Sequence, residues 1–207
     1  MAKKPTTEAE FARADEKSRK RKAARDRMLA DKTVEKGLLI VHTGKGKGKS
    51  TAAFGLVARA IGNGMKVGVV QYVKGKWETG ERVVLDHFPD QVTIRTMGEG
   101  FTWETQDKAR DIAAAENAWA ASKEMIADPS YHLVVLDELN IVLRYDSLDL
   151  DEVVTTLVGR REMLHVVVTG RNAKPELIEA ADLVTEMTQI KHPFREQNVR
   201  AQKGIEF

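Results

Sequence analysis

The strongest constraint on the fold of this chain is a loop of alternating glycine and lysine that ends in a serine, residues 44–50. The apolar run before it, residues 38–41, is typical of a buried strand, and residues 51–61 are typical of a helix. Glycines let backbone N–H groups approach an anion, and the N-terminus of the helix adds its positive dipole end. The sequence therefore predicts a phosphate-binding loop, formed by Gly44, Lys45, Gly46, Lys47, Gly48, Lys49, Ser50 and Thr51.

Two side chains of this loop have expected roles. Lys49 can reach phosphate oxygens as a point charge, and the hydroxyl of Ser50 can bind a magnesium ion. The loop is shorter than the common pattern, because three residues separate Gly44 from Gly48 and Thr43 stands in the usual glycine position. The shorter loop weakens the expectation that a nucleotide sits here as it does in ordinary P-loop hydrolases.

The composition limits the class of protein. The 207 residues are 42% hydrophobic, which is enough for one filled domain with appendages. The chain has no cysteine, which excludes disulfides and thiolate metal sites and suits a reducing cytoplasm. Its sequence contains neither an apolar run of membrane-spanning length nor the apolar core of a secretion signal. We expect a cytoplasmic protein that does not insert into a membrane.

The first segment, residues 1–36, is predicted to be a charged helical arm. It holds twelve Lys and Arg against seven Asp and Glu, although the whole chain carries only +2. Residues 7–10 fit a capping box, and strong helix formers continue to about Ala30 without a stripe of apolar positions. A basic arm could contact nucleic acid, but the interleaved acids and the lone aromatic Phe11 favour a solvated helix. Such an arm could order against a ligand or a second subunit.

The second segment, residues 37–207, alternates apolar strands with helices. This alternation predicts an α/β fold with a mostly parallel sheet covered by helices on both faces. Together with the glycine loop, we expect a fold of the RecA-like P-loop class. Ligands of such sheets bind at the carboxyl ends of the strands. The strands are expected at residues 38–43, 66–73, 92–96, 133–136, 165–169 and 183–187, and the helices at residues 51–62, 82–87, 105–127, 149–160 and 174–181.

Charged residues follow two of these strands. The apolar run 133–136 ends in Asp137 and Glu138, which is typical of a Walker B strand whose carboxylates hold a metal directly or through water. These two acids alone do not separate ATP hydrolysis from another use of ATP. Arg171 follows the strand at residues 165–169, where it could either contact a triphosphate or remain solvated.

A loop between glycines, residues 98–103, carries two large aromatic side chains, Phe101 and Trp103. Exposed aromatics often mark a ligand or a partner, although the same pair could be a hydrophobic plug over the core. The five histidines show no metal-ligand spacing with one another, so we expect structural or solvated roles for them.

Taken together, these motifs resemble the P-loop ATP:corrinoid adenosyltransferases of cobalamin biosynthesis and salvage. The resemblance extends from about residue 37 to the C-terminus, and the short loop is itself the form found in that family. Ser50 stands where the family often has threonine, which keeps the hydroxyl. The matching pieces are residues 43–55, 67–75, 100–106, 134–140, 169–171 and 191–206.

The resemblance implies that a Co(I) corrinoid attacks the 5′ carbon of ATP, which is bound with reversed polarity, and that triphosphate leaves. It implies catalytic roles for Lys49, Glu138, Phe101 and Trp103, and ATP contacts from the loop and Arg171. Ser50, Asp137 and Glu138 would hold Mg²⁺ or Mn²⁺, and Lys74 and Trp77 would join the two aromatics at the corrinoid. It also implies a reduced flavin or flavodoxin-like electron donor and a homodimer, with neither nucleic acid nor membrane as a partner.

Two other classes of function remain open from the residues alone. A RecA-like ATPase that acts on nucleic acid would share the loop, the two acids and the basic arm. A non-catalytic nucleotide sensor would use the arm and the C-terminal tail as its switching parts.

Overall fold

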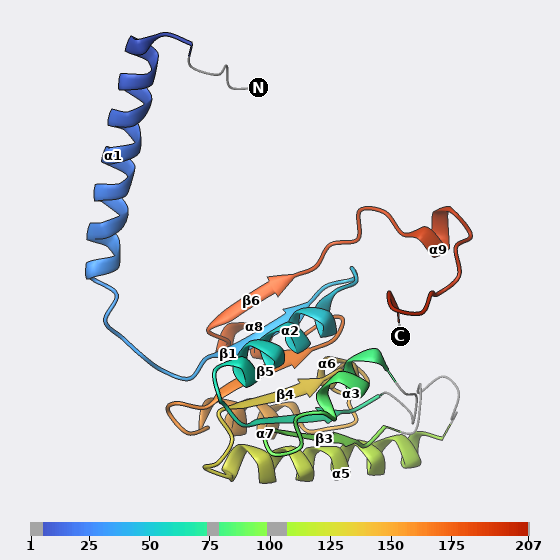
Figure 1. Ribbon diagram of the computed structural model, residues 1–207. Coiled ribbons are helices and arrows are strands. Elements are labelled where there is room, and N and C mark those ends of the chain that lie inside the picture. Colours follow the sequence, from blue (N-terminus) through green and yellow to red (C-terminus); the bar gives the residue numbers. More distant parts are fainter. Residues whose placement is uncertain (1–5, 74–78, 99–106, 207) are drawn as a thin grey trace. The chain divides into compact units, whose positions relative to one another are not determined.

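The computed structural model describes residues 6–73, 79–98 and 107–206 (Figure 1). The chain divides into two compact units, Met1–Glu35 and Lys36–Phe207. Across the described ranges, no helix combines the length and the apolar character needed to cross a membrane.

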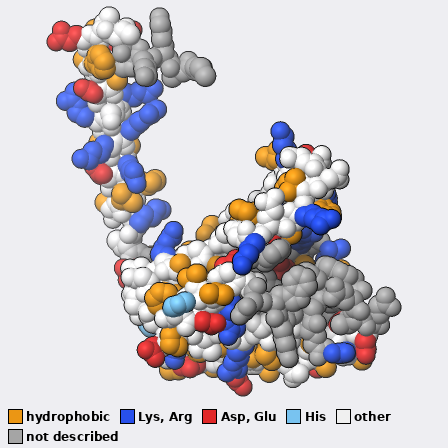
Figure 2. Space-filling model, turned by 45° about the vertical axis from the view of Figure 1, so that its right-hand side comes forward, with side chains coloured by type: hydrophobic (Ala, Val, Ile, Leu, Met, Phe, Trp, Pro, Cys, Tyr) orange, Lys and Arg blue, Asp and Glu red, His pale blue; other side chains and the backbone are white. Residues whose placement is uncertain are grey.

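The described part of the first unit contains one long helix, α1 (Glu8–Ala30). Thr7 caps it by accepting a hydrogen bond from the Glu10 backbone N–H, and the Glu10 carboxylate accepts one from the Thr7 N–H, so the predicted capping box is confirmed. None of its residues is buried, and Lys and Arg side chains with a few acids between them line the helix in Figure 2. The helix therefore lacks a core-facing stripe, as expected.

The second unit is built on a six-stranded sheet in which every adjacent pair of strands is parallel. The strand order is β3-β2-β4-β5-β1-β6, so one strand, β5, separates β1 from β4. This arrangement confirms the expected parallel α/β fold of the RecA-like class. The strands are β1 (Leu39–Thr43), β2 (Val67–Gln71), β3 (Val92–Thr96), β4 (Leu133–Asp137), β5 (His165–Thr169) and β6 (Leu183–Glu186).

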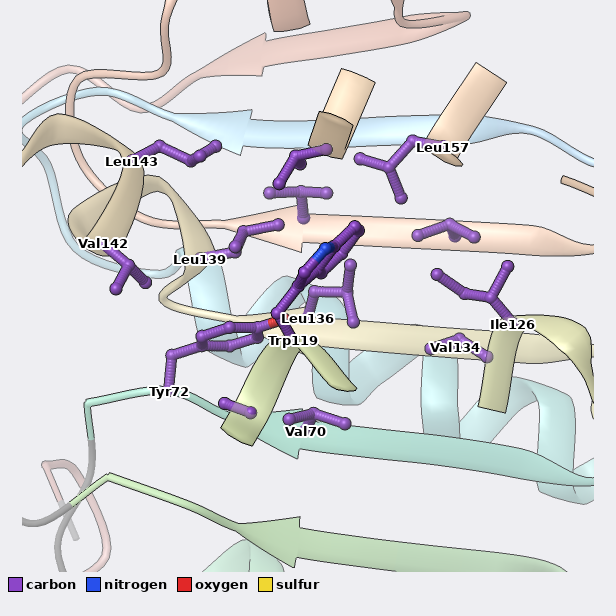
Figure 3. Close-up of a cluster of buried hydrophobic side chains, with 14 of the residues drawn as sticks. Val70, Tyr72, Trp119, Ile126, Val134, Leu136, Leu139, Val142, Leu143 and Leu157 are labelled. Atoms are coloured by element: carbon purple, nitrogen blue, oxygen red, sulfur yellow. The ribbon is translucent and has the colours of Figure 1, made fainter. Parts of the chain in front are cut away.

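Helices cover both faces of the sheet, because successive strand residues are apolar and point to opposite sides. The helices α2 and α3 pack on one face, where Ile40, Val135 and Val167 are buried. The helices α5 to α8 pack on the other face, whose core includes Trp119, Leu136 and Leu139 (Figure 3). The helices of this unit are α2 (Lys49–Gly62), α3 (Gly80–Leu85), α5 (Lys108–Ala127), α6 (Leu139–Arg144), α7 (Leu150–Val158), α8 (Pro175–Ala180) and α9 (Pro193–Glu196).

The helix α6 is absent from the sequence-based prediction. It starts directly after Glu138 and has six residues, which is too short for a helical period to show in the sequence. Elsewhere the element boundaries agree with the expected ones or differ from them by one or two residues. The expected start of the helix at residue 105 lies outside the described residues, and within them α5 starts at Lys108 after the N-cap Asp107. In the described part of the C-terminal tail, residues 188–206, where no period is expected, the short helix α9 is the only helix or strand.

Candidate functional site

The predicted phosphate-binding loop leaves β1 at Thr43 and enters α2 at Lys49. Its glycines are required for two different reasons. Gly48 has a φ of 102°, a left-handed conformation that side chains rarely adopt. A Cβ on Gly46 would stand 2.7 Å from the Met187 carbonyl oxygen, which already accepts a hydrogen bond from the Gly46 N–H at 2.6 Å. The loop is therefore packed against the chain segment that follows β6.

Lys49 lies inside this loop, with only 7% of the residue exposed. Its ammonium donates a hydrogen bond to the Gly44 carbonyl at 3.0 Å and another to the Gly46 carbonyl. Burial lowers the pKa of Lys49, the charge of Glu138 raises it, and the charge of Arg171 lowers it further. Glu138, which is predicted to bind the metal, and Arg171, which is predicted to contact ATP, thus both act electrostatically on Lys49.

The carboxylate of Asp137 joins the loop to two other strands. It is fully buried and accepts hydrogen bonds from Ser50 Oγ at 2.7 Å and from Thr169 Oγ1 at 2.8 Å. Gln71 Nε2 donates to its other oxygen at 3.4 Å. The hydroxyl and carboxylate that were predicted as metal ligands therefore meet at one point. Since Mg²⁺ is usually held by one or two protein oxygens together with substrate phosphates, the donor set at this point fits that ion.

The other predicted acid, Glu138, has an unusual backbone. Its φ of 67° and ψ of 17° are left-handed, a conformation that costs on the order of 1 kcal/mol or more for a non-glycine residue. Its backbone N–H donates to Thr169 Oγ1 at 2.9 Å, which helps to hold the turn between β4 and α6. Backbone strain of this kind concentrates at functional sites, which agrees with the role predicted for this turn.

The loop that carries Arg171 is fixed to its neighbours by backbone contacts. Asn140, which is fully buried, donates from Nδ2 to the Gly170 carbonyl at 3.0 Å. A Cβ on Gly170 would lie 2.8 Å from the Cβ of Asn140, so only glycine fits there. The Ala173 N–H donates to Thr43 Oγ1 at 3.0 Å. These contacts hold Arg171 beside the end of β1 and the beginning of the phosphate-binding loop.

Arg171 and Lys45 line one pocket of about 500 Å³. Two further arginines line it, Arg144 at the end of α6 and Arg195 in α9. The C-terminal tail also reaches the loop directly, because Glu206 forms an ion pair with Lys47. The tail thus contributes charged side chains to the surroundings of the loop.

The structure brings most of the predicted phosphate and metal residues together. The exposed Thr51 lies in the first turn of α2 and lines a different groove, together with Phe54 and with Val84 of α3. The four residues predicted for the corrinoid, Lys74, Trp77, Phe101 and Trp103, lie outside the described residues.

Several residues of the site were missed by the sequence analysis. Gln71 could have been found, because the parallel register aligns it with Asp137 at the ends of β2 and β4. Thr169 was seen only as the residue before Gly170 and Arg171. The sequence analysis assigns no role to Arg144 or Arg195. Arg144 lies on the unpredicted helix α6, and Arg195 lies in the C-terminal tail.

The geometry defines a class of protein. A glycine-rich loop between a parallel strand and a helix, with a hydroxyl that meets a buried carboxylate of another strand, is the site of a P-loop nucleotide-binding protein. Residues 35–207 match the protein family described as ATP:corrinoid adenosyltransferase BtuR/CobO/CobP. This chain belongs to the ATP:corrinoid adenosyltransferase family, which confirms the expected resemblance.

Curated relatives agree with this assignment. The chain is 57% identical over 202 residues to a corrinoid adenosyltransferase of Sinorhizobium sp, covering 97% of this chain and 94% of the relative. It is 55% identical to a corrinoid adenosyltransferase of Pseudomonas aeruginosa, with coverages of 93% and 94%. It is 44% identical to the corrinoid adenosyltransferase CobA of Salmonella typhimurium, with coverages of 94% and 98%.

Solved structures are similar at a lower level. The crystal structure of the RadB recombinase has a TM-score of 0.46 and 17% sequence identity, and the match covers 77% of this chain and 78% of that chain.

Proposed function

We propose that this chain transfers the 5′-deoxyadenosyl group of ATP to the Co(I) centre of a corrinoid in cobalamin biosynthesis or salvage. The family assignment supports this transferase activity over the two alternatives, the nucleic-acid ATPase and the nucleotide sensor. The observation that carries the proposal is the meeting of Ser50 and Asp137 at 2.7 Å beside the loop that encloses Lys49. That arrangement suits the stabilisation of a polyphosphate.

The reaction needs a leaving group to be stabilised and two reactants to be aligned. The electron pair of Co(I) forms a bond to the 5′ carbon, the bond from that carbon to the 5′ oxygen breaks, and the oxygen keeps its electron pair as part of triphosphate. No proton is transferred in this step, so a general base is not required. Lys49 and Arg171 would neutralise the negative charge that the leaving oxygen and its phosphates gain, which is the kind of electrostatic stabilisation that accelerates such a step.

A divalent cation is part of the proposal. Ser50 and Asp137 would hold Mg²⁺ or Mn²⁺, and Glu138 would contact it directly or through water. When bound, the ion would reduce the charge repulsion within the polyphosphate. Within the described residues no three His, Asp or Glu side chains gather as a metal site of their own.

The corrinoid side of the proposal follows from the family resemblance. Phe101 and Trp103 would pack against the lower face of the corrin and displace its axial ligand, which raises the reduction potential of the cobalt. Lys74 and Trp77 would contact the same substrate. A reduced flavin or a flavodoxin-like protein would supply the single electron that converts Co(II) to Co(I).

We also propose roles for the two segments of the chain and a compartment for the reaction. Residues 37–207 would bind nucleotide and corrinoid, and residues 1–36 would close over the site of a second subunit in a homodimer. We place the reaction in the cytoplasm, because ATP and reduced flavins are available there. A chain without cysteine, and so without disulfides, suits that reducing compartment. Nucleic acid and membranes are not partners in this proposal.

One incubation tests the proposed function. The full-length protein is mixed without oxygen with Mg-ATP, a corrinoid and a strong chemical reductant, and the products are separated. We expect triphosphate and a light-sensitive adenosylated corrinoid in equal amounts. Release of orthophosphate without an alkylated corrinoid would instead favour the ATPase, and ATP binding without any product would favour the sensor.

A further inference from the structure

A strongly basic pocket lies beside the phosphate-binding loop. Four cationic side chains line it, and they come from four separate parts of the chain: the loop after β1, the end of α6, the loop after β5, and α9. Among the described residues that line it, Glu186 is the single acid, and uncharged polar residues such as Asn172 complete the wall. The four cations are Lys45, Arg144, Arg171 and Arg195.

Within the described part of the chain, the cations of this basic pocket have no acidic partners. In the described ranges of the chain, none of the four lies within ion-pair distance of a carboxylate, although nearby Lys47 pairs with Glu206 and Lys174 pairs with Asp146 at 2.9 Å. Arg144 has a different neighbour, the ring of Tyr145, with 5.4 Å from its guanidinium carbon to the ring centroid. Unpaired cations that line one concave surface raise the local concentration of anions, which favours an anionic ligand.

The basic pocket is continuous with the phosphate-binding loop. Lys45 belongs to both, since it lies between Gly44 and Gly46 and its side chain lines the pocket. Arg171 also links the two, because its charge acts on Lys49 inside the loop. An anion in the pocket could therefore be part of the same molecule that the loop holds.

The chemistry of the lining favours phosphate over other anions. Three of the four cations are arginines, whose planar guanidinium groups bind phosphate oxygens through two parallel hydrogen bonds. The pocket volume of about 500 Å³ suits a chain of phosphates. A corrinoid is a macrocycle with a ring of side arms, and it could place only a peripheral phosphate or carboxylate there.

We infer that the basic pocket is an oligophosphate site that receives the terminal phosphates of ATP and retains the triphosphate after adenosyl transfer. This inference rests on the proposed function for the identity of the ligand. The inference assigns phosphate contacts to Arg144 and Arg195, both of which lie outside the phosphate-binding loop. It also predicts that these two arginines set the strength of product inhibition by triphosphate.

The test is a calorimetric titration of the full-length protein with inorganic triphosphate. The variant Arg144→Gln/Arg195→Gln should bind triphosphate at least about tenfold more weakly than the parent, because two charge-assisted contacts are removed. Arg200→Gln is the matched control, since Arg200 is an exposed arginine of the same tail that does not line the pocket, and its affinity should stay within about twofold of the parent. The exposed positions of Arg144 and Arg195 predict unchanged melting temperatures for both variants.

A second titration separates the two sources of phosphate. The same proteins are titrated with cobalamin, which carries a phosphodiester, and with cobinamide, which lacks it. If the double variant binds cobalamin more weakly but binds cobinamide and triphosphate as the parent does, the pocket serves the corrinoid and the inference is wrong. Unchanged affinity for triphosphate and for cobalamin also overturns the inference.

These titrations are independent of the proposed reaction, because they require neither a reductant nor turnover. A parent protein that binds triphosphate through the two arginines but forms no adenosylated corrinoid would contradict the proposed function and leave the pocket assignment standing. If the parent is active but the double variant binds triphosphate normally, the pocket assignment is contradicted and the proposed function stands.

Discussion

The Ser50 hydroxyl lies 2.7 Å from the Asp137 carboxylate, although 87 positions separate the two residues in the chain. The strand order explains the contact, because β1 and β4 are parallel and only β5 lies between them. The hydroxyl oxygen and the carboxylate oxygen thus meet at the carboxyl edge of the sheet, where a divalent cation would be shared with a nucleotide.

Replacement of Ser50 tests this contact. Ser50→Ala removes the hydroxyl that would hold the cation, so turnover at saturating ATP should fall by roughly two orders of magnitude. Its dependence on magnesium concentration should shift to higher values. Ser50→Thr keeps a hydroxyl at the same position and should retain most of the activity. Equal magnesium curves for Ser50→Ala and the parent would show that Ser50 does not hold the metal.

The glycine loop gives a second prediction. In Gly46→Ala the new Cβ would meet the Met187 carbonyl at 2.7 Å, so the loop must move and ATP affinity should fall by at least about tenfold. Gly55→Ala in α2 is the matched control, because a Cβ there has nothing within 4 Å. It should stabilise the helix by about 0.5–1 kcal/mol. Calorimetric ATP binding and thermal melts measure both effects, and normal ATP affinity in Gly46→Ala would contradict the close packing of the loop.

His165 predicts how stability depends on pH. Its Nδ1 accepts a hydrogen bond from the Leu38 backbone N–H at 3.1 Å, and burial, aided by the charge of Arg160, lowers the pKa of His165 below 6.5. The unfolded chain therefore binds this proton more tightly than the folded protein does. The contribution of His165 to stability should be complete above its unfolded pKa of about 6.5, and it should be lost as the pH falls through the lowered value.

The variant His165→Asn isolates this effect. Its amide oxygen can accept the same hydrogen bond from Leu38, but it does not titrate. The free energy of unfolding, measured at about pH 7.5 and about pH 5.5, should fall less for the variant than for the parent. Other titrating groups are common to both proteins and cancel in the comparison, so equal losses would exclude the role assigned to His165.

The signals that predicted the fold are local. The strand, the glycine loop, the capping box of α1 and the buried run of β4 are each contained in a few consecutive residues, and the structure has all of them. The unpredicted features depend on tertiary structure. The left-handed backbone of Glu138 is held by Thr169 from another strand, and Arg195 reaches the basic pocket through the tail. No periodicity in the sequence reports such contacts.

The aromatic residues proposed for the corrinoid give a prediction about mechanism. If Phe101 and Trp103 serve only the reduction of cobalt, Phe101→Ala and Trp103→Ala should be nearly inactive with a Co(II) corrinoid and a flavin reductant. Both variants should recover much of their activity when a strong chemical reductant supplies Co(I). The measured quantity is the ratio of the two activities, with a melting curve alongside. An unchanged ratio together with a lower melting temperature would instead indicate a hydrophobic plug over the core.

The central claim is that the bond between the 5′ carbon and the 5′ oxygen of ATP is the one that breaks. The most direct measurement uses ATP with a heavy oxygen isotope at that bridging position, incubated with the protein, magnesium and a Co(I) corrinoid. Mass spectrometry then locates the isotope. We predict that all of it leaves in triphosphate and that the adenosylated corrinoid contains none. Isotope retained on an adenosine-containing product, with unlabelled orthophosphate released, would mean that a phosphorus–oxygen bond is cleaved and would contradict the account.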